Sequence, residues 1–288
     1  ASQAIEGKEF IASTDEGFRP VNLFNGPDGA MYVVDMHRGI IQHKAYISQY
    51  LAEQLANKKL DTLQNAGRIL KVVSKTSKLN PVPNLSKANS KELLALLNHP
   101  NGWLRDRSQQ LLIQKKDPSV VKNVIDLTKT ANEFSTSIHA LYVLDGVNAL
   151  SFEMLSDVVK QSKQPEIIAH ALGLMERFAT TQQVAKMKEI STQLLGQNNE
   201  TIDLYLAFSL NPWLKLSEAT FLPVLSEIEK KYADRRIYQE AIVSSLEGKE
   251  ENYLSTQNPN FLLKGNLTLA VNNHQKKEMN PIFVKETN

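Results

Sequence analysis

The pattern of apolar and polar residues changes its period close to residue 75. Before this point, short apolar runs alternate with turn residues, and after it the apolar positions recur with the period of a helix. The turn sequence Gly26-Pro27-Asp28-Gly29 is strong, because Pro presets φ and Gly accepts positive φ. The pattern predicts about four short strands, at Val21 to Phe24, Ala30 to Asp35, Gly39 to Gln42 and Gly67 to Val73.

A helix is expected between the third and fourth of these strands. Ile47, Leu51 and Leu55 recur at i, i+4 and i+8, which is the stripe of an amphipathic helix within residues 44–60. Residues 1–75 are therefore predicted to form one β-rich segment with an inserted helix. Four short strands bury too little apolar surface to be stable alone, so this segment should lean on the first helical pairs or on the inserted helix.

Residues 76–90 have the composition of a linker, with two prolines and many small polar residues. Beyond them, plausible starts of a recurring kind of helix fall at a spacing of roughly 30 to 35 residues, which is typical of two-helix solenoid repeats. These starts are Asn101, Ser135, Pro165, Asn199 and Asp234. Residues 91–250 are thus predicted to be a HEAT-like α-α superhelix of about five helical hairpins, stacked in one right-handed curved array.

Two prolines bear on the helices of this array. Asp117-Pro118 is a cap followed by Pro at the first helical position and indicates a helix start. The pair near Leu216 to Leu246 is the least regular, because Pro223 must either delay its helix or kink it. Residues 251–288 are mixed in character, with Asn-Pro at 258 and 280, and are expected to be a tail or a linker toward a further domain. The fold class is therefore mainly α with a small β-rich segment at its start.

Composition removes several classes of function. The chain has 33 Lys and Arg against 31 Asp and Glu, so a nucleic-acid partner is not expected. No apolar stretch approaches the length of a transmembrane helix. There is no cysteine, which excludes thiol catalysis, disulfides, thiolate metal sites and covalent haem attachment in this chain. None of the six histidines has a second histidine at i+3 or i+4, so no metal site is expected.

Several phrases of the sequence resemble a large bacterial family of membrane-bound or sugar dehydrogenases, related to sorbosone and glucose dehydrogenases. In the β-rich segment these are FIASTDEGFRPVNLFNGPDGAMYVVDMHRG and GRILKVV, and in the helical part LLNHPNGWLRDRSQQLLIQ and IHALYVLDGVNAL. The resemblance is specific over about residues 10 to 150 and is only architectural beyond them. It implies that the β-rich segment is the last blade of a β-propeller.

In that family the propeller is followed by HEAT repeats and often by a c-type cytochrome domain. The resemblance therefore implies a periplasmic, cell-surface or extracellular parent protein with haem c and pyrroloquinoline quinone as cofactors. The partners of this chain would be the other propeller blades and a cytochrome c domain of the same parent. The earlier blades are expected upstream of Ala1 and the haem motif beyond Asn288, so this chain is expected to hold no cofactor itself.

The densest polar cluster follows the second predicted strand and contains Asp35, His37 and Arg38. In the parent, His37 could act as a base and Arg38 as an anion clamp at the propeller channel. Alternatively, Asp35 caps a turn and the cluster is structural, which is favoured because an acid-base site needs partners that this chain lacks. Arg19 resembles a family position that faces the channel, but a structural salt bridge is the favoured role.

A second crowded position is the start of a helix with Trp103, Arg105 and Arg107. Trp and Arg are the usual anchors of a docking face. The favoured alternative is that Trp103 packs a repeat junction while the charged residues make local pairs. No catalytic residue is assigned, because neither a phosphate-binding glycine loop nor a nucleophile elbow is present.

Two hypotheses of function follow. In the preferred one, the chain is a non-catalytic scaffold, propeller end plus HEAT repeats, of a secreted dehydrogenase-like redox protein linked to cytochrome c. In the other, it is an independent helical-repeat module that binds a protein or glycan partner on its concave face.

Overall fold

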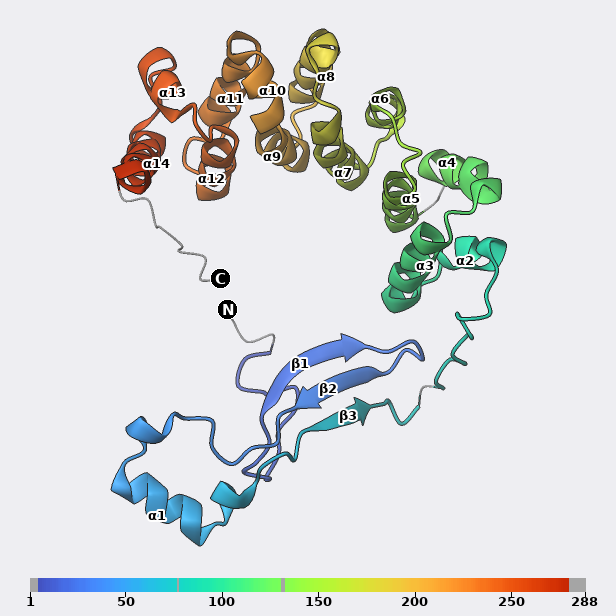
Figure 1. Ribbon diagram of the computed structural model, residues 1–288, viewed down its shortest axis with the longest axis vertical. Coiled ribbons are helices and arrows are strands. Elements are labelled where there is room, and N and C mark those ends of the chain that lie inside the picture. Colours follow the sequence, from blue (N-terminus) through green and yellow to red (C-terminus); the bar gives the residue numbers. More distant parts are fainter. Residues whose placement is uncertain (1–4, 77, 131–132, 280–288) are drawn as a thin grey trace, which may run out of the picture. The chain divides into compact units, whose positions relative to one another are not determined.

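A computed structural model describes residues 5–76, 78–130 and 133–279 of the chain. Contacts between Cα atoms divide it into two units, and the last boundary between them falls within helix α3 (Gly102–Lys115). The first unit contains residues 1–88 and 99–107, and the second contains residues 89–98 and 108–288. The fold is mainly helical, with one small sheet near the N-terminus (Figure 1).

The sheet of the first unit is antiparallel, with the strand order β1-β2-β3. Its strands are β1 (Pro20–Asn25), β2 (Met31–Asp35) and β3 (Arg68–Val72). The predicted turn at residues 26–29 joins β1 to β2, and Gly29 adopts φ 82°, which a residue with a Cβ rarely does. Three of the four predicted strands are therefore present, close to the expected positions.

The strand predicted at Gly39 to Gln42 was wrong, because these residues are irregular. After β2 the chain turns at His37, whose φ is 43°, and Gly39 then packs against the backbone of Leu60, where a Cβ would lie 2.2 Å from the Leu60 carbonyl oxygen. Helix α1 (Gln49–Asn57) follows within the predicted helical segment and buries Leu55. The neighbour of β2 is instead β3, after the long connection that contains α1.

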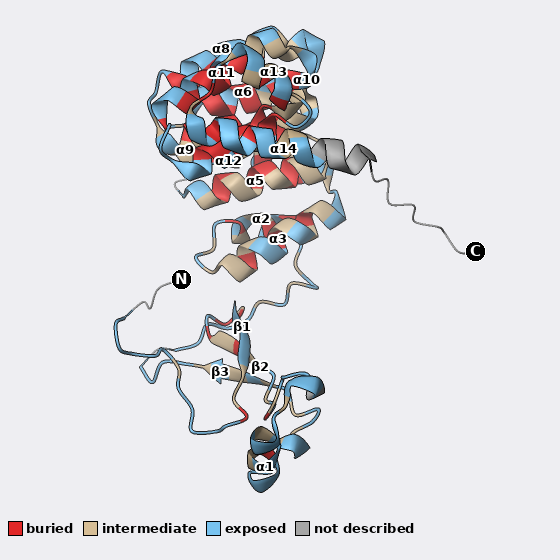
Figure 2. Cartoon of the chain, turned by 90° about the vertical axis from the view of Figure 1, so that its left-hand side faces the viewer, coloured by how far each residue is buried: buried red, intermediate tan, exposed pale blue. Residues whose placement is uncertain are grey.

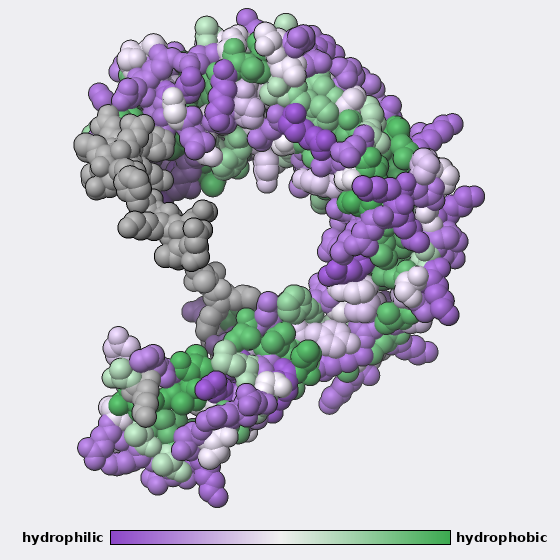
Figure 3. All heavy atoms as spheres, viewed as in Figure 1, coloured by the Kyte–Doolittle hydropathy of each residue, from purple (hydrophilic) through white to green (hydrophobic). Residues whose placement is uncertain are grey.

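The apolar core of the first unit is small. Among its described residues the buried apolar side chains are those of Ala30, Val33, Leu55 and Leu104. Several large apolar side chains on the strands stay exposed, including Phe24 at 54% and Ile69 at 69%. Figure 3 shows hydrophobic residues at the surface in this part of the chain. Burial of apolar surface therefore stabilises this unit only weakly, and polar contacts contribute a larger share of its stability.

The start of α3 belongs to this unit, and Asn101, just before the helix, holds the turn between β1 and β2 in place. The Asn101 side-chain amide donates to the Gly26 carbonyl oxygen at 2.8 Å, and its carbonyl oxygen accepts from the Trp103 N–H at 2.9 Å. The Asn80 N–H donates to the Asp28 carbonyl oxygen at 3.0 Å. The β-rich segment is thus hydrogen-bonded to residues at the start of α3, which supplements its small apolar core.

The second unit is an array of helical pairs (Figure 1). It opens with α2 (Ser90–Leu96), whose N-cap Asn89 forms a capping box with Glu92. Among the described residues, five pairs then follow: α4 (Val121–Thr130) with α5 (Phe134–Gly146), α6 (Phe152–Gln161) with α7 (Pro165–Met175), α8 (Val184–Leu195) with α9 (Glu200–Ser209), α11 (Glu218–Lys231) with α12 (Arg236–Ser245), and α13 (Glu250–Thr256) with α14 (Phe261–Met279). The short α10 (Asn211–Leu216) precedes α11.

Helices of the array form two rows. The inner row is α5, α7, α9, α12 and α14, in which each helix contacts the next, and the outer row contains α4, α6, α8, α11 and α13 (Figure 1). Buried residues lie between the two rows (Figure 2). Because every pair packs against the pair that follows it, the unit is an open, curved array and not a closed bundle. The right-handedness of the array stays a prediction.

The helix starts were predictable from local signals. Second helices begin at Gly102, Phe134, Pro165, Glu200 and Arg236, each within two residues of the expected position. The Asp117 carboxylate accepts from the Ser119 N–H at 2.9 Å, as expected for a cap. Pro223 does not delay its helix, because α11 begins at Glu218.

The segment from residue 251 differs from the expected tail. Residues 250–279 form α13 and α14, and the side chains of Tyr253, Leu263 and Leu267 are fully buried. The Tyr253 hydroxyl donates to the buried Glu229 carboxylate at 2.9 Å. The array therefore continues through a further pair, and the part of the predicted tail at 280–288 lies outside the described residues.

Candidate functional site

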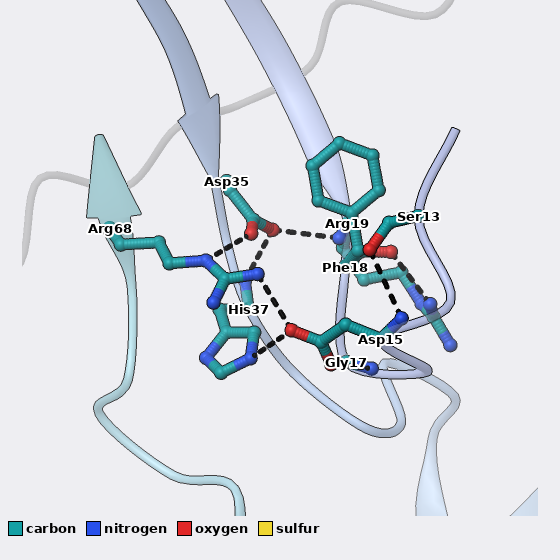
Figure 4. A network of polar contacts seen from close by, with 8 residues as sticks. All are labelled: Ser13, Asp15, Gly17, Phe18, Arg19, Asp35, His37 and Arg68. Carbon is teal, nitrogen blue, oxygen red and sulfur yellow. Dashed lines mark hydrogen bonds and ion pairs between the residues drawn. The ribbon is translucent and has the colours of Figure 1, made fainter. Parts of the chain in front are cut away.

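The polar residues that follow β2 belong to a network that joins three segments of the first unit (Figure 4). One segment is the loop at residues 13–19, the second is the end of β2, and the third is the start of β3. We call Asp15, Asp35, His37 and Arg68 the Asp–His–Arg network. Figure 4 shows these four side chains pointing toward one another.

Asp35 is the buried centre of the network. One of its carboxylate oxygens accepts from the Arg19 and His37 N–H groups at 2.7 and 2.9 Å, and the other accepts from Nε of Arg68 at 2.7 Å. Burial acts to raise the pKa of Asp35, but these donors outweigh burial, so the pKa lies below its ordinary value. Asp35 is therefore charged, and both of its carboxylate oxygens already accept hydrogen bonds from the protein.

Asp15 links the remaining two side chains. Its Oδ2 atom lies 3.0 Å from Nε2 of His37 and 2.8 Å from a terminal nitrogen of Arg68, and Oδ1 accepts from the Gly17 N–H at 2.9 Å. The Gly17 N–H, followed by Arg68, lowers the pKa of Asp15. The hydrogen bonds to Asp15 and then Asp35 raise the pKa of Arg68 above its ordinary value. A carboxylate beside a histidine is found in many general-base sites. Here, however, the Asp15 oxygen that contacts His37 also contacts the Arg68 guanidinium, which is always charged.

The backbone fixes the position of the histidine. His37 adopts the left-handed conformation, which turns the chain immediately after β2. Gly17 lies against its ring, since a Cβ at that position would come within 3.1 Å of the imidazole. The His37 side chain is consequently held between the loop and the strand ends, with little freedom to approach a substrate.

The other sequence-predicted residues have separate environments. The Arg19 guanidinium donates to the carbonyl oxygens of Phe18 and Gly39 at 2.8 and 3.3 Å, which ties the loop to the segment after β2. Arg38 is exposed. The structure thus brings Asp35 and His37 together, and it adds Asp15 and Arg68, which sequence reasoning missed.

The residues at the start of α3 make local contacts. Arg105 donates to the carbonyl oxygens of His99 and Pro100 at 2.7 and 2.9 Å, and the Arg107 guanidinium lies 5.6 Å from the ring centroid of the half-buried Trp103. Arg105 therefore closes the turn that precedes its own helix. Arg107 covers the Trp103 ring by a cation-π contact.

A second ionic cluster supports the turn between β1 and β2. The buried Asp28 carboxylate contacts the Lys71 ammonium at 2.5 Å, the Tyr32 hydroxyl at 3.0 Å and the Ala30 N–H at 3.1 Å. The Lys71 ammonium, acting against burial, lowers the pKa of Asp28 to about 2. In the sequence, only the Pro-Asp-Gly turn pointed to this cluster. Lys71 lies on β3, far along the chain from Asp28, so no local pattern could indicate that the two side chains meet.

The inner row of helices offers two further features. The Tyr142 hydroxyl and Nδ1 of His170 lie 3.0 Å apart across α5 and α7 and share a hydrogen bond. A groove of about 610 Å³ lies between α12 and α14, with Leu262 and Leu269 on one wall. Its volume is in the range of ligand-binding clefts. Neither feature was indicated by a sequence motif.

Neither a metal centre nor a membrane span is apparent in the parts of the chain that the structure covers. Within residues 5–76, 78–130 and 133–279, no group of three or more His, Asp or Glu side chains is arranged to hold a metal ion. None of the described helices combines the length and apolar character that crossing a bilayer requires.

Comparison with known proteins gives one match. Residues 1–76 match the family described as "Domain of unknown function (DUF7133)". This match covers the whole β-rich segment and ends at the predicted start of the linker. No curated protein and no solved structure matches the chain.

Proposed function

We propose that this chain is the non-catalytic scaffold portion of a secreted, dehydrogenase-like redox protein linked to a cytochrome c domain. The sequence resemblance described above supports the class of parent protein. On this proposal the β-rich unit adjoins further propeller blades, the helical array adjoins the cytochrome domain, and haem c and pyrroloquinoline quinone belong to those other parts. The parent would be periplasmic or located at the cell surface.

The observation that carries the scaffold role is that Asp35 and Arg68 of the Asp–His–Arg network are occupied by contacts within the protein. Both carboxylate oxygens of Asp35 accept hydrogen bonds from the protein, and Arg68 bridges Asp35 and Asp15. A general base needs a lone pair directed at substrate, and an anion clamp needs a guanidinium edge that is not already occupied. The network instead compensates for a small apolar core by joining three segments of the unit.

The lack of cysteine agrees with the proposal that haem c is held by another part of the parent protein. Covalent attachment of haem c requires thiols, and the chain has none. A quinone or sugar site in a propeller also requires residues from several blades around one axis, whereas the described sheet has three strands. Redox chemistry in the parent would therefore depend on residues outside this chain.

The purified chain provides the test. It is mixed with pyrroloquinoline quinone, calcium, a panel of aldoses and an artificial electron acceptor, and a visible spectrum is recorded alongside. We expect no dye reduction above the buffer control and no Soret band. The variant His37→Ala is compared with His43→Ala, which removes an exposed histidine outside the network. Dye reduction that is lost in His37→Ala but kept in His43→Ala would contradict the scaffold role.

A second candidate function has its own support. We infer that the array could instead be an independent module that binds a partner on its concave face, as helical solenoids often do. The observation that favours it is the presence of exposed aromatic side chains and a groove on the inner row of helices. Saturable binding of a partner by the isolated chain, without any redox activity, would favour this function over the first.

A further inference from the structure

Four ring-bearing side chains line up across three consecutive helices of the inner row. They are Tyr142 on α5, His170 on α7, and Tyr205 and Phe208 on α9, and we call them the aromatic row. The Tyr142 and His170 rings meet edge to face with centroids 5.6 Å apart, and the Tyr205 and Phe208 rings are 6.4 Å apart. The row therefore consists of two ring pairs on neighbouring helices.

The row faces the concave side of the array. Helix α7 packs against α5, α6 and α9, and its remaining side faces the concave side of the array (Figure 1). His170 and Gly173 are half-buried and exposed, whereas the residues next to them along α7 are buried, so both lie on this remaining side. Tyr205 and Phe208 are 43% and 38% exposed, although both are large aromatic side chains. Tyr205 is close enough to Tyr142 to act on its pKa, which burial, then Asp145 and Tyr205, raise. The two ring pairs thus lie on helices that pack against each other, α5 on α7 and α7 on α9.

Tyr205 has an unused hydrogen-bonding group. Within the residues that the structure describes, its hydroxyl makes no hydrogen bond, in contrast to the hydroxyls of Tyr142 and Tyr238. An amphipathic ring with a free hydroxyl at a concave surface is the kind of side chain that recurs where proteins bind ligands.

Gly173 lies one turn beyond His170 on α7, on the same side of the helix. A Cβ at this position would have no atom within 4 Å, so packing does not require glycine there. Glycine in the middle of a helix is unfavourable relative to alanine, and close approach of a ligand to the backbone is one reason for its presence. Position 173 is therefore an open site on the exposed side of α7.

The row carries no net charge. Burial lowers the pKa of His170, which favours the neutral imidazole. Asp145 and Arg177, which lie beside the row, form an ion pair with each other. A neutral ligand complements such a surface better than a charged one does, because it leaves neither partner with a desolvated, unpaired charge.

We propose that the aromatic row binds a proline-rich peptide in the polyproline II conformation. Such peptides are neutral, dock on aromatic-lined grooves and expose backbone carbonyl oxygens that lack internal partners, to which Tyr205 can donate. A polyproline II turn advances roughly 9 Å, and packed helices are roughly 8–10 Å apart. Successive turns of the peptide therefore meet successive inner helices. This proposal rests on the second candidate function and names its ligand.

Fluorescence anisotropy of labelled decaproline with the full chain tests the proposal. We expect saturable binding, with a labelled Gly-Ser peptide of equal length as the negative control. Tyr205→Phe, which keeps the ring and removes the hydroxyl, should weaken binding by roughly two- to tenfold, the factor for one lost hydrogen bond. Gly173→Ala should weaken it as well, because the new methyl group occupies the open site on α7. The matched control Tyr50→Phe alters an exposed tyrosine far along the sequence and should bind as the wild type does.

The outcomes separate the ligand from the function. No saturable binding of decaproline, or binding that Tyr205→Phe and Gly173→Ala leave unchanged, would overturn the proposal. Cellohexaose serves as a glycan probe in competition with the peptide. If cellohexaose binds in a Tyr205-dependent manner and decaproline does not, the proline ligand is wrong while a binding module stands. If neither probe binds, the proposal and the support for that second function both fail.

Discussion

The Nε atom of Arg68 lies 2.7 Å from a carboxylate oxygen of Asp35, and the two residues also stand opposite each other in the register of β2 and β3. The ion pair therefore lies where the strands already bring the chain together. Because the Asp35 side chain is buried, its charge depends on protein donors for stabilisation. A substitution that changes one acceptor oxygen into a donor should disturb the unit strongly.

Asp35→Asn tests this dependence. The amide can still accept from the Arg19 and His37 N–H groups, but its nitrogen then faces Nε of Arg68, donor against donor. We expect a loss of about 1.5–3 kcal/mol in the free energy of unfolding, the range for hydrogen bonds to charged groups. Urea unfolding followed by circular dichroism measures it. Asp61→Asn, at an exposed position, should have no measurable effect, and equal stability of the two variants would speak against the argument.

The Asp28–Lys71 ion pair makes stability depend on acid pH. The pKa of Asp28 is lowered to about 2 in the folded chain, chiefly by Lys71, whereas an unfolded Asp has a pKa of about 3.9. The stabilisation is therefore fully present above pH ~4 and is lost as the pH falls toward about 2. We expect Lys71→Met to flatten this part of the pH profile of the melting temperature. Lys87→Met, at an exposed position, should keep the wild-type slope.

Local sequence signals located most of the array. Pro165 begins α7 at its first turn, and the Asn199 side chain caps α9 by accepting from the Ile202 N–H at 3.1 Å. These signals act within one turn of a helix, so they are readable without knowledge of the fold. Helix α14 was missed because its apolar residues do not form one stripe, since Leu263 and Leu267 are buried whereas Leu262 and Leu269 are exposed, and because the sequence becomes polar from residue 272.

The network of the first unit shows what local signals omit. Asp35 and His37 were conspicuous because they are adjacent to a strand, but Arg68 reaches Asp15 across 53 residues of chain. That contact exists because β3 pairs with β2 after a long connection, and no local feature of the sequence specifies this pairing. The same reason explains the wrong strand at Gly39 to Gln42, where the chain turns away from β2 and Gly39 packs on Leu60.

Two adjacent leucines test whether α14 is part of the array. The Leu263 side chain is fully buried, and its neighbour Leu262 is 54% exposed. Leu263→Ala should lower the free energy of unfolding by about 2–5 kcal/mol, as for other buried leucines, because it leaves a cavity. Leu262→Ala should cost about 0.5 kcal/mol or less, like other surface substitutions. Similar values for both variants in urea unfolding would show that residues 261–279 do not pack on the array as a helix.

Two helical glycines should respond to alanine in opposite directions. At Gly173 a Cβ meets no atom within 4 Å, so Gly173→Ala should stabilise the chain by about 0.5–1 kcal/mol through helix propensity. At Gly146, the last residue of α5, a Cβ would lie 2.7 Å from the Ile113 side chain. Gly146→Ala should therefore cost about 1–3 kcal/mol by overpacking.

Thermal unfolding of the two glycine variants, beside the wild type, decides between packing and ligand binding as the reason for glycine at position 173. A higher melting temperature for Gly173→Ala means that neither packing nor the backbone conformation of α7 requires glycine there, so weaker decaproline binding by this variant would be an effect of the added methyl group on the ligand. A lower melting temperature would mean that α7 requires glycine for its own conformation. In that case weakened decaproline binding by Gly173→Ala would reflect a disturbed helix, and the evidence for the aromatic row would rest on Tyr205→Phe.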